Sequence, residues 1–366
     1  MPDWLIYIAY AILVFGVLVL VHEMGHFAVA KLVGVLVYEF SIGFGPRLVG
    51  FRRGETAYNL RVFPLGGFVR MAGMDPEEDR RESGETKDTK DIKENNPANY
   101  AAVAVVAPER SFANKTVLQR MAIIAAGPVM NFALAVVLFA VIIWVSGVPV
   151  NKINQVIPDR PAAEVGIKPG DTITRIDTQR VNTWEDILQI IHASPEKELQ
   201  IEVQRDQETR VFEVKPEKDP ETQWGLIGIT PQTRKPGVFE SLKQGSVKTY
   251  EMLSLTFMFI GKMISKEMPV ELSGPVRITY ELGKAAEMGF IFLVNIAGFL
   301  SLQIGLFNLL PIPALDGSRL VFLGWEGIRG TPVDQAKENF IHMVGLMLLL
   351  FIMVVITYQD IVQMFS

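Results

Sequence analysis

The stretch VLVLVHEMGHFAVAKL, residues 17–32, places two histidines and a glutamate inside an otherwise apolar run. A charged side chain at the centre of a membrane helix costs roughly 2.5–3.5 kcal/mol to insert, so ionisable groups there are functional by default. In a helix, the HEMGH spacing puts His22 and His26 on one face, one turn apart, with Glu23 beside them. We therefore predict a membrane helix that carries a polar site.

The HEMGH residues have the chemistry of a hydrolytic zinc site. Two imidazoles stacked on one helix face can bind a single Zn²⁺. Bound zinc lowers the pKa of a water ligand to roughly 7, and Glu23 can accept the water's proton and pass it to a leaving amine. The pattern predicts Zn²⁺ as cofactor, His22 and His26 as metal ligands and Glu23 as the catalytic base.

The bulk composition limits the class of protein. The chain has 366 residues, of which 49% are hydrophobic, and a mean hydropathy of +0.26, so it is long enough for two or three folding units and more apolar than most soluble enzymes. A net charge of −5 argues against a nucleic-acid partner. Because cysteine is absent, disulfides, thiolate metal sites and cysteine nucleophiles are excluded.

Four segments are apolar over the approximately 20 residues that cross a bilayer, and they lie near 4–33, 120–146, 286–311 and 338–358. The first is predicted to be a retained span rather than a signal peptide, because it has no basic residue before its apolar stretch. The fold class is therefore a polytopic α-helical membrane protein with four transmembrane helices.

The distribution of Lys and Arg predicts the orientation. The N-terminal flank and the tail from 358 onward contain neither residue, whereas the segments 34–119 and 312–337 carry several near the ends of the spans. We expect these two loops in the cytoplasm, and both termini and the region 147–285 outside. The HEMGH site then lies towards the cytoplasmic side.

The remaining sequence divides into segments with distinct patterns. Residues 38–70 alternate and are rich in β-formers, which predicts a hairpin apolar enough to re-enter the membrane face. Residues 75–99 are dense in charge and are expected to be a solvated insert without a catalytic role. The complete predicted division is 1–37 (first span with HEMGH), 38–74 (hairpin region), 75–119 (charged cytoplasmic loop), 120–146 (second span), 152–232 (soluble domain), 238–285 (interfacial helix and connection), 286–316 (third span) and 317–366 (short cytoplasmic helix and fourth span).

Residues 152–232 resemble a PDZ domain of α+β type. Two glycine-bearing turns in PAAEVGIKPGDTITRIDTQRV lead into a strand, and a short helix and two further strands follow. The similarity is most specific around Gly166, Gly170 and Asp171. PDZ domains bind extended peptides by adding a strand to a sheet edge. A peptide or partner in this groove and a spacer with an empty groove both stay open, and His192 is expected to be a surface histidine.

A catalytic zinc normally has three protein ligands. Asp316, in NLLPIPALDG, and His342, at the start of the fourth span, are both predicted at the cytoplasmic side. Pro311 and Pro313 interrupt the helix before Asp316, and irregular backbone at membrane depth must be buried in protein or line a cavity. Asp316 as the N-cap of the following helix is an equally good interpretation of the residue types alone.

A family resemblance favours Asp316. The motifs HEMGH, GPVMNF and NLLPIPALDG, with a PDZ-like domain between the second and third, resemble the bacterial site-2 proteases, the regulator-of-sigma-E protease group of intramembrane zinc metalloproteases. The resemblance implies that His22, His26 and Asp316 bind zinc and that Glu23 is the catalytic glutamate. Well-known enterobacterial members carry two PDZ domains, whereas this chain has room for one.

The resemblance also implies further roles. Asn131, Asn308, Pro311 and Pro313 would support the site or contact substrate, and Gly43, Phe44 and Gly45 would lie along the substrate strand. The implied partners are single-pass transmembrane proteins that have already been trimmed outside, such as anti-sigma factors, and remnant signal peptides. The implied location is the bacterial inner membrane, with the lipid bilayer as surroundings.

Two rival functions remain from other classes. A metal transporter would also bury histidine and aspartate, but the chain shows no internal repeat and a transporter has no evident use for Glu23 or a PDZ-like unit. An inactive membrane scaffold would tether partners through the PDZ-like unit, although all four expected catalytic residues are present.

Overall fold

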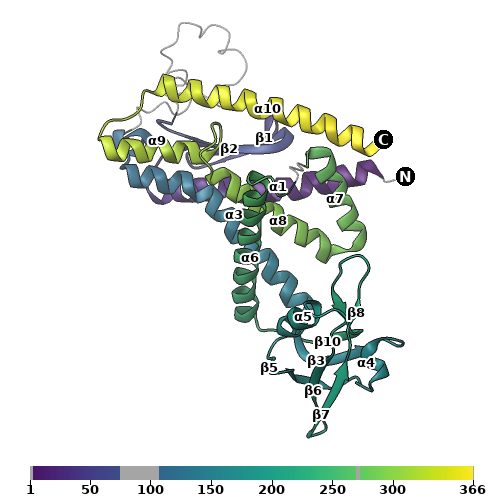
Figure 1. The fold of residues 1–366 in the computed structure, drawn as a ribbon. Helices are drawn as coiled ribbons and strands as arrows, with labels where there is room; N and C mark the ends of the chain where they lie inside the picture. Colours follow the sequence, from purple (N-terminus) through teal and green to yellow (C-terminus); the bar gives the residue numbers. More distant parts are fainter. Residues whose placement is uncertain (1–2, 75–106, 269–272, 366) are drawn as a thin grey trace. The chain divides into compact units, whose positions relative to one another are not determined.

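The computed structural model describes residues 3–74, 107–268 and 273–365, which form two compact units, here called unit 1 (1–139 with 245–366) and unit 2 (140–244). The charged insert predicted at 75–99 lies outside the described residues. Figure 1 shows the fold and labels most of its elements, numbered in chain order.

Unit 1 is mainly helical. Its helices are α1 (Trp4–Leu32), α3 (Val117–Ser146), α6 (Val238–Ile264), α7 (Pro275–Met288), α8 (Phe290–Leu309), α9 (Asp316–Arg329) and α10 (Gln335–Phe365), and the ends of α3 and α6 extend into unit 2. Four of them, α1, α3, α8 and α10, are long and apolar enough to cross a membrane, as predicted. The predicted interfacial segment contains α6, which begins well before its apolar run.

A two-stranded ribbon follows α1. Strand β1 (Val37–Arg53) pairs with β2 (Thr56–Met71), and both strands bend so strongly that residues 39–42 pair on one side with 67–70 and on the other with 57–60. Gly43, with φ +87°, makes the bend possible, because a Cβ there would lie 2.5 Å from the carbonyl oxygen of Phe63. The segment 67–71 thereby becomes an edge, with one strand partner among the described residues.

Helix α7 packs against both α1 and the C-terminal part of α10. Gly283 lies against the ring of Tyr7, so that a Cβ would come within 2.1 Å of it. Asp360, which is buried on α10, accepts hydrogen bonds from the backbone N–H groups of Gly274 and Arg277, at 3.1 and 2.9 Å, and so caps the first turn of α7.

Unit 2 is a small α+β fold. Its sheet has the strand order β10 (Ile229–Arg234), β3 (Val148–Val156), β4 (Thr172–Ile176), β6 (Leu199–Arg205) and β7 (Glu208–Val214), and β5 (Gln179–Arg180) pairs with β4. The other elements are α4 (Pro161–Glu164), α5 (Trp184–His192), β8 (Glu217–Lys218) and β9 (Gly225–Leu226).

Local sequence explains the elements of unit 2. Strand β6 alternates between buried Leu199, Ile201 and Val203 and less buried polar residues, and α5 adds its buried apolar residues to the same core. Thr183 and Asp186 form a capping box that starts α5. The carboxylate of Asp171 accepts hydrogen bonds from Arg205 Nε and Nη2 at 2.6 and 2.7 Å and from the Lys168 N–H at 2.9 Å.

Candidate metal and catalytic site

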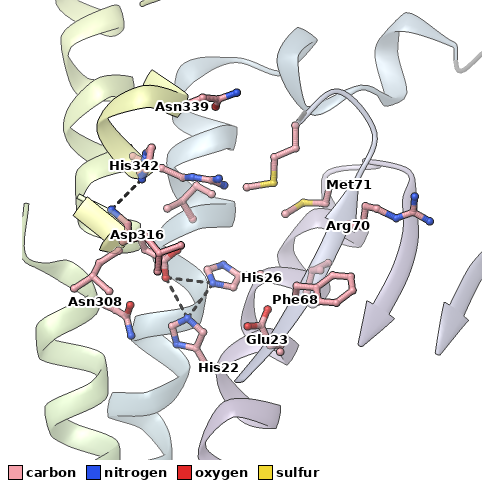
Figure 2. A pocket seen from close by; sticks show the side chains of 18 of the residues that line it. His22, Glu23, His26, Phe68, Arg70, Met71, Asn308, Asp316, Asn339 and His342 are labelled. Carbon is pink, nitrogen blue, oxygen red and sulfur yellow. Dashed lines mark hydrogen bonds and ion pairs between the residues drawn. The ribbon is translucent and has the colours of Figure 1, made fainter. Parts of the chain in front are cut away.

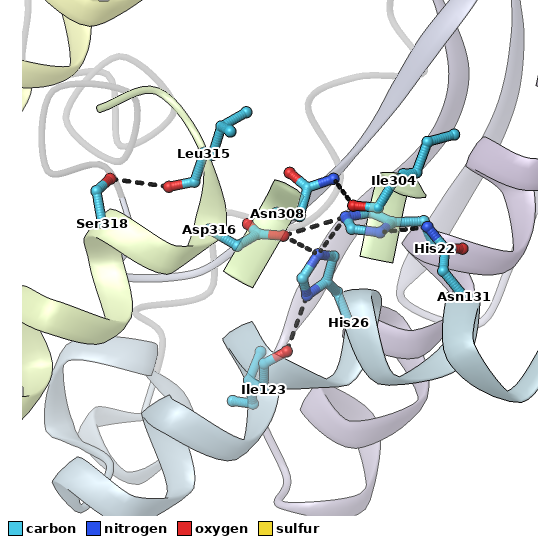
Figure 3. A network of polar contacts seen from close by, with 9 residues as sticks. All are labelled: His22, His26, Ile123, Asn131, Ile304, Asn308, Leu315, Asp316 and Ser318. Atoms are coloured by element: carbon cyan, nitrogen blue, oxygen red, sulfur yellow. Dashed lines mark hydrogen bonds and ion pairs between the residues drawn. The ribbon is translucent and has the colours of Figure 1, made fainter. Parts of the chain in front are cut away.

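Three ligand atoms from distant parts of unit 1 converge on one point. The Nε2 atoms of His22 and His26 are 3.2 Å apart, and Oδ2 of Asp316 lies 3.1 Å from the first and 3.4 Å from the second (Figure 3). Both histidines are more than nine-tenths buried. Among the described residues, these three form the cluster whose spacing can hold a metal ion.

The spacing fits a tetrahedral zinc. With Zn–N and Zn–O bonds of about 2.0–2.2 Å, two ligand atoms of a tetrahedral site are about 3.3 Å apart. The observed separations of 3.1–3.4 Å match this value. Gly127 of α3 keeps the space beside the ligands open, because a Cβ there would lie 2.3 Å from Nε2 of His26 and 2.8 Å from Nε2 of His22.

A second contact, made by the Nδ1 atom, orients each imidazole. His26 Nδ1 donates to the carbonyl oxygen of Ile123, 2.8 Å away, which leaves its Nε2 as a free acceptor for a metal. The amide of Asn131 lies 3.3 Å from Nδ1 of His22. An amide oxygen and nitrogen exchange places by a half-turn. With Oδ1 facing the ring, His22 donates its Nδ1–H and keeps Nε2 for the metal.

The carboxylate of Asp316 comes from the first turn of α9. The loop 310–315 between α8 and α9 contains both prolines, and Ser318 Oγ donates to Leu315 O at 2.8 Å to close the turn. Oδ2 of Asp316 faces both Nε2 atoms, at 3.1 Å from His22 and 3.4 Å from His26. A carboxylate that binds a metal ion there must be ionised.

A cavity of about 750 Å³ opens from the metal cluster. Glu23 lines it, and Figure 2 shows its carboxyl group beside the imidazole pair, on the side of Phe68. The lining also includes Asn339, Met343 and Leu346 of α10. The arrangement puts an acid–base group and a metal cluster against one space large enough for a peptide segment.

The edge segment 67–71 of β2 forms one wall of this cavity. Gly67 approaches Glu23 so closely that a Cβ would lie 2.8 Å from Cγ of Glu23. The residue pattern predicted a hairpin at 38–70, but it did not indicate that segment 67–71 lines the cavity. The available signal was the pair of glycines before Phe68, which permits such a close approach.

The other residues named from the sequence occupy different places. Asn308 lines the cavity and donates to Ile304 O at 3.0 Å, whereas Asn131 is completely buried behind His22 and does not line the cavity. Gly43, Phe44 and Gly45 lie at the bend of β1 and are also outside the lining. His342, the alternative third ligand, lines the cavity but is not part of the cluster.

Comparison with known proteins identifies the family. Residues 10–352 match the model of Peptidase family M50. The chain belongs to peptidase family M50. The zinc metalloprotease RasP of Geobacillus kaustophilus is 37% identical and the regulator of sigma-W protease RasP of Bacillus subtilis is 35% identical, with 97% of this chain covered in both, and 97% and 98% of the relatives.

This M50 peptidase is a zinc metalloendopeptidase, so the predicted family, enzyme class and cofactor are confirmed. A solved PDZ domain of an SdrC-like protein from Listeria monocytogenes aligns with 23% of the chain and 86% of its own length, at 29% identity and a TM-score of 0.20. The four long apolar helices of the peptidase and its separate α+β unit are compatible with a membrane protein that carries a PDZ domain.

Proposed function

We propose that this peptidase cuts the membrane-spanning segments of other proteins, with His22, His26 and Asp316 holding Zn²⁺. The observation that carries the proposal is the convergence of the three ligand atoms, 3.1–3.4 Å apart, where two of them come from the largely apolar helix α1 and the third from α9. A hydrolytic site on such a helix serves a substrate that is itself in the membrane. Water therefore has to reach the site through the cavity.

Glu23 is proposed as the general base and then the general acid. Zn²⁺ held by the cluster supplies the Lewis acidity that activates water. Glu23 takes the proton of the attacking water as the new C–O bond forms, and it delivers that proton to the amine nitrogen as the C–N bond breaks. The position of its carboxyl group in the cavity supports this role.

The edge segment 67–71 is proposed to bind the substrate. A helical peptide bond is a poor target, so the substrate has to unwind, and its backbone groups are costly to leave unpaired in an apolar environment. Strand addition to an edge that lines the cavity would pair them. The bend at Gly43, Phe44 and Gly45 would shape this edge. Asn131, Asn308, Pro311 and Pro313 would support the metal ligands or contact the substrate.

The orientation proposed is the one that the basic loops predict, with both termini and unit 2 outside and the metal cluster towards the cytoplasm of a bacterial cell. The β1–β2 hairpin is proposed to re-enter the membrane, since Leu48, Val49 and Phe51 are all exposed. Unit 2 is proposed as a PDZ domain. Suitable substrates are single-pass proteins already trimmed outside, and the relative named regulator of sigma-W protease supports anti-sigma factors among them.

The test is cleavage of a model transmembrane peptide by the full-length protein in liposomes. We expect cleavage to be blocked by a chelator and restored by zinc. Glu23→Gln should lower the rate by about 10³-fold or more while one zinc per chain stays bound, because only proton transfer is lost. Asp316→Ala should lose the zinc. Zinc retention in Asp316→Ala would contradict the proposed ligand set.

The same liposomes separate the rival functions. Metal flux across the bilayer that survives Glu23→Gln would support a transporter. Full signalling in a cell that carries Glu23→Ala would support an inactive scaffold. We expect neither, because Glu23 lies beside the metal cluster, where a proton acceptor serves hydrolysis.

A further inference from the structure

His342 lines the catalytic cavity without belonging to the metal cluster. Its Nδ1 accepts a hydrogen bond from the backbone N–H of Ala314, with 3.1 Å between the two nitrogens (Figure 2). Ala314 lies two residues before Asp316, in the loop that joins α8 to α9. The imidazole therefore contacts the backbone that presents the third ligand atom.

The backbone at Ala314 has an unusual conformation. Its φ is +77°, a region that residues other than glycine rarely occupy and keep only where their surroundings hold them. The preceding residue, Pro313, packs directly on Gly345 of α10, where a Cβ would lie 2.2 Å from Pro313 Cβ and 2.7 Å from its carbonyl carbon. His342 and Gly345 are three residues apart on one face of the helix. His342 thus contacts Ala314, and Gly345 contacts Pro313, in the loop before Asp316.

Helix α10 has few other attachments. Among its described residues, only Gly345 and Asp360 are buried, and Asp360 lies at the opposite end of the helix, where it contacts the start of α7. Near the cavity, the ring of His342 also meets Phe322 of α9 edge-to-face, with 6.0 Å between centroids. The contacts of α10 at this end thus fall on the loop and helix that carry Asp316.

We propose that His342 is a positioning residue for the zinc site. By accepting the Ala314 N–H, it fixes the loop in the conformation that brings the Asp316 carboxylate to His22 and His26. The packing of Gly345 against Pro313 helps to fix the same loop conformation. This inference rests on the proposed function, in which Asp316 is the third zinc ligand.

His342 acts through Asp316 and is not itself a ligand. A backbone N–H can only donate, so the neutral ring accepts at Nδ1 and carries its proton on Nε2. A protonated nitrogen cannot bind a metal ion. Nε2 lies 3.8 Å from Oε1 of Glu338, which is on the same helix.

The test measures zinc retention and does not depend on activity. Purified full-length protein in detergent is loaded with one zinc per chain, and the transfer of zinc to a chromogenic chelator is timed. Contacts behind metal ligands typically change metal affinity 10–100-fold. We expect His342→Ala to bind one zinc at saturation and to release it at least tenfold faster than the unmodified protein. His342→Asn should release it within about threefold of the unmodified rate, since its Oδ1 can accept in place of Nδ1.

Two further variants make the test independent of a single substitution. Gly345→Ala should speed release as His342→Ala does, because it displaces α10 from the same loop. His192→Ala, in unit 2, is the matched histidine control and should leave the release rate unchanged. Release at the unmodified rate from His342→Ala, or equally fast release from His342→Asn and His342→Ala, would overturn the inference. Asp316→Ala that keeps its zinc would instead overturn the proposed function.

Discussion

Both units bury apolar side chains, and they differ in the polar side chains beside them. In unit 2 the core consists of isoleucine, valine, leucine, alanine and tryptophan, and Ile173, Ile187 and Ile201 have no exposed surface. In unit 1 the fully buried positions include Asn131 and Ser301, and Ser301 Oγ donates to the Asn131 carbonyl oxygen at 2.8 Å. Large apolar side chains of α10, such as Phe351, are instead mostly exposed.

The difference follows from the surroundings of each unit. Water drives apolar side chains inward, so the core of unit 2 carries its stability. Lipid is as apolar as leucine, so packing of small residues and internal hydrogen bonds hold membrane helices together. In unit 1, Ser301 and Asn131 contribute such internal hydrogen bonds directly behind the metal cluster. Substitutions should accordingly damage stability in unit 2 and metal binding or chemistry in unit 1.

The largest effect is expected from Gly127→Ala in unit 1. The new Cβ would overlap both imidazoles, at 2.3 and 2.8 Å from their Nε2 atoms. We expect loss of zinc by metal analysis and of cleavage by about 10³-fold or more, since the metal's chemistry is lost. Gly16→Ala in α1 is the matched control, because a Cβ there meets nothing within 4 Å. Full zinc occupancy in Gly127→Ala would contradict the site geometry.

The second effect tests the core of unit 2. Ile187→Ala should lower the free energy of unfolding of unit 2 by about 3 kcal/mol through lost burial and a cavity. Hydrogen exchange of the full-length protein can measure this change in β4 and β6 separately from unit 1. Gln189→Ala, exposed on the same helix, should change it by less than about 0.5 kcal/mol. Loss of zinc in Ile187→Ala would contradict the expectation that substitutions in the core of unit 2 leave metal binding in unit 1 unchanged.

A smaller effect is expected from Gly67→Ala at the edge segment. The Cβ would lie 2.8 Å from Glu23 Cγ and would displace the base but not the metal ligands. Because misplacement of a catalytic group by about 1 Å can cost up to 10²-fold, we expect a 10–100-fold lower turnover with zinc stoichiometry unchanged. Cleavage at the unmodified rate would show that the edge does not set the position of Glu23.

The smallest effect concerns acid and unit 2. Burial raises the pKa of Asp171, but hydrogen bonds from Arg205 and the Lys168 N–H outweigh it, so its pKa is lowered. A lowered pKa stabilises the folded state above the unfolded-state value of about 3.9 and loses that contribution as pH falls below it. Hydrogen exchange in β4 should therefore show a lower free energy of unfolding of unit 2 below about pH 4. Asp171→Asn should be less stable at pH 7 and less sensitive to acid.

Much of the site was predictable because three of its residues lie within five positions of one helix. HEMGH fixes His22, Glu23 and His26 through the geometry of one helix, and family motifs implied Asp316. The edge segment 67–71 was not predictable in detail, because the register of a bent hairpin depends on pairings that period-2 alternation leaves open. The contact of Asn131 with His22 was likewise hidden, since it depends on how two helices pack.

The sequence by itself determined the four apolar helices, the pair of histidines with their glutamate, and the alternating strands of unit 2, because each follows from composition or from spacing within one element. Residue types alone left Asp316 and His342 open as third ligand, and the tertiary structure brings Asp316, and not His342, into the cluster with His22 and His26. Both residues line the same cavity. Which of them reaches His22 and His26 depends on a loop held at Ala314 and on how α10 packs against it, and neither feature is encoded in a local pattern.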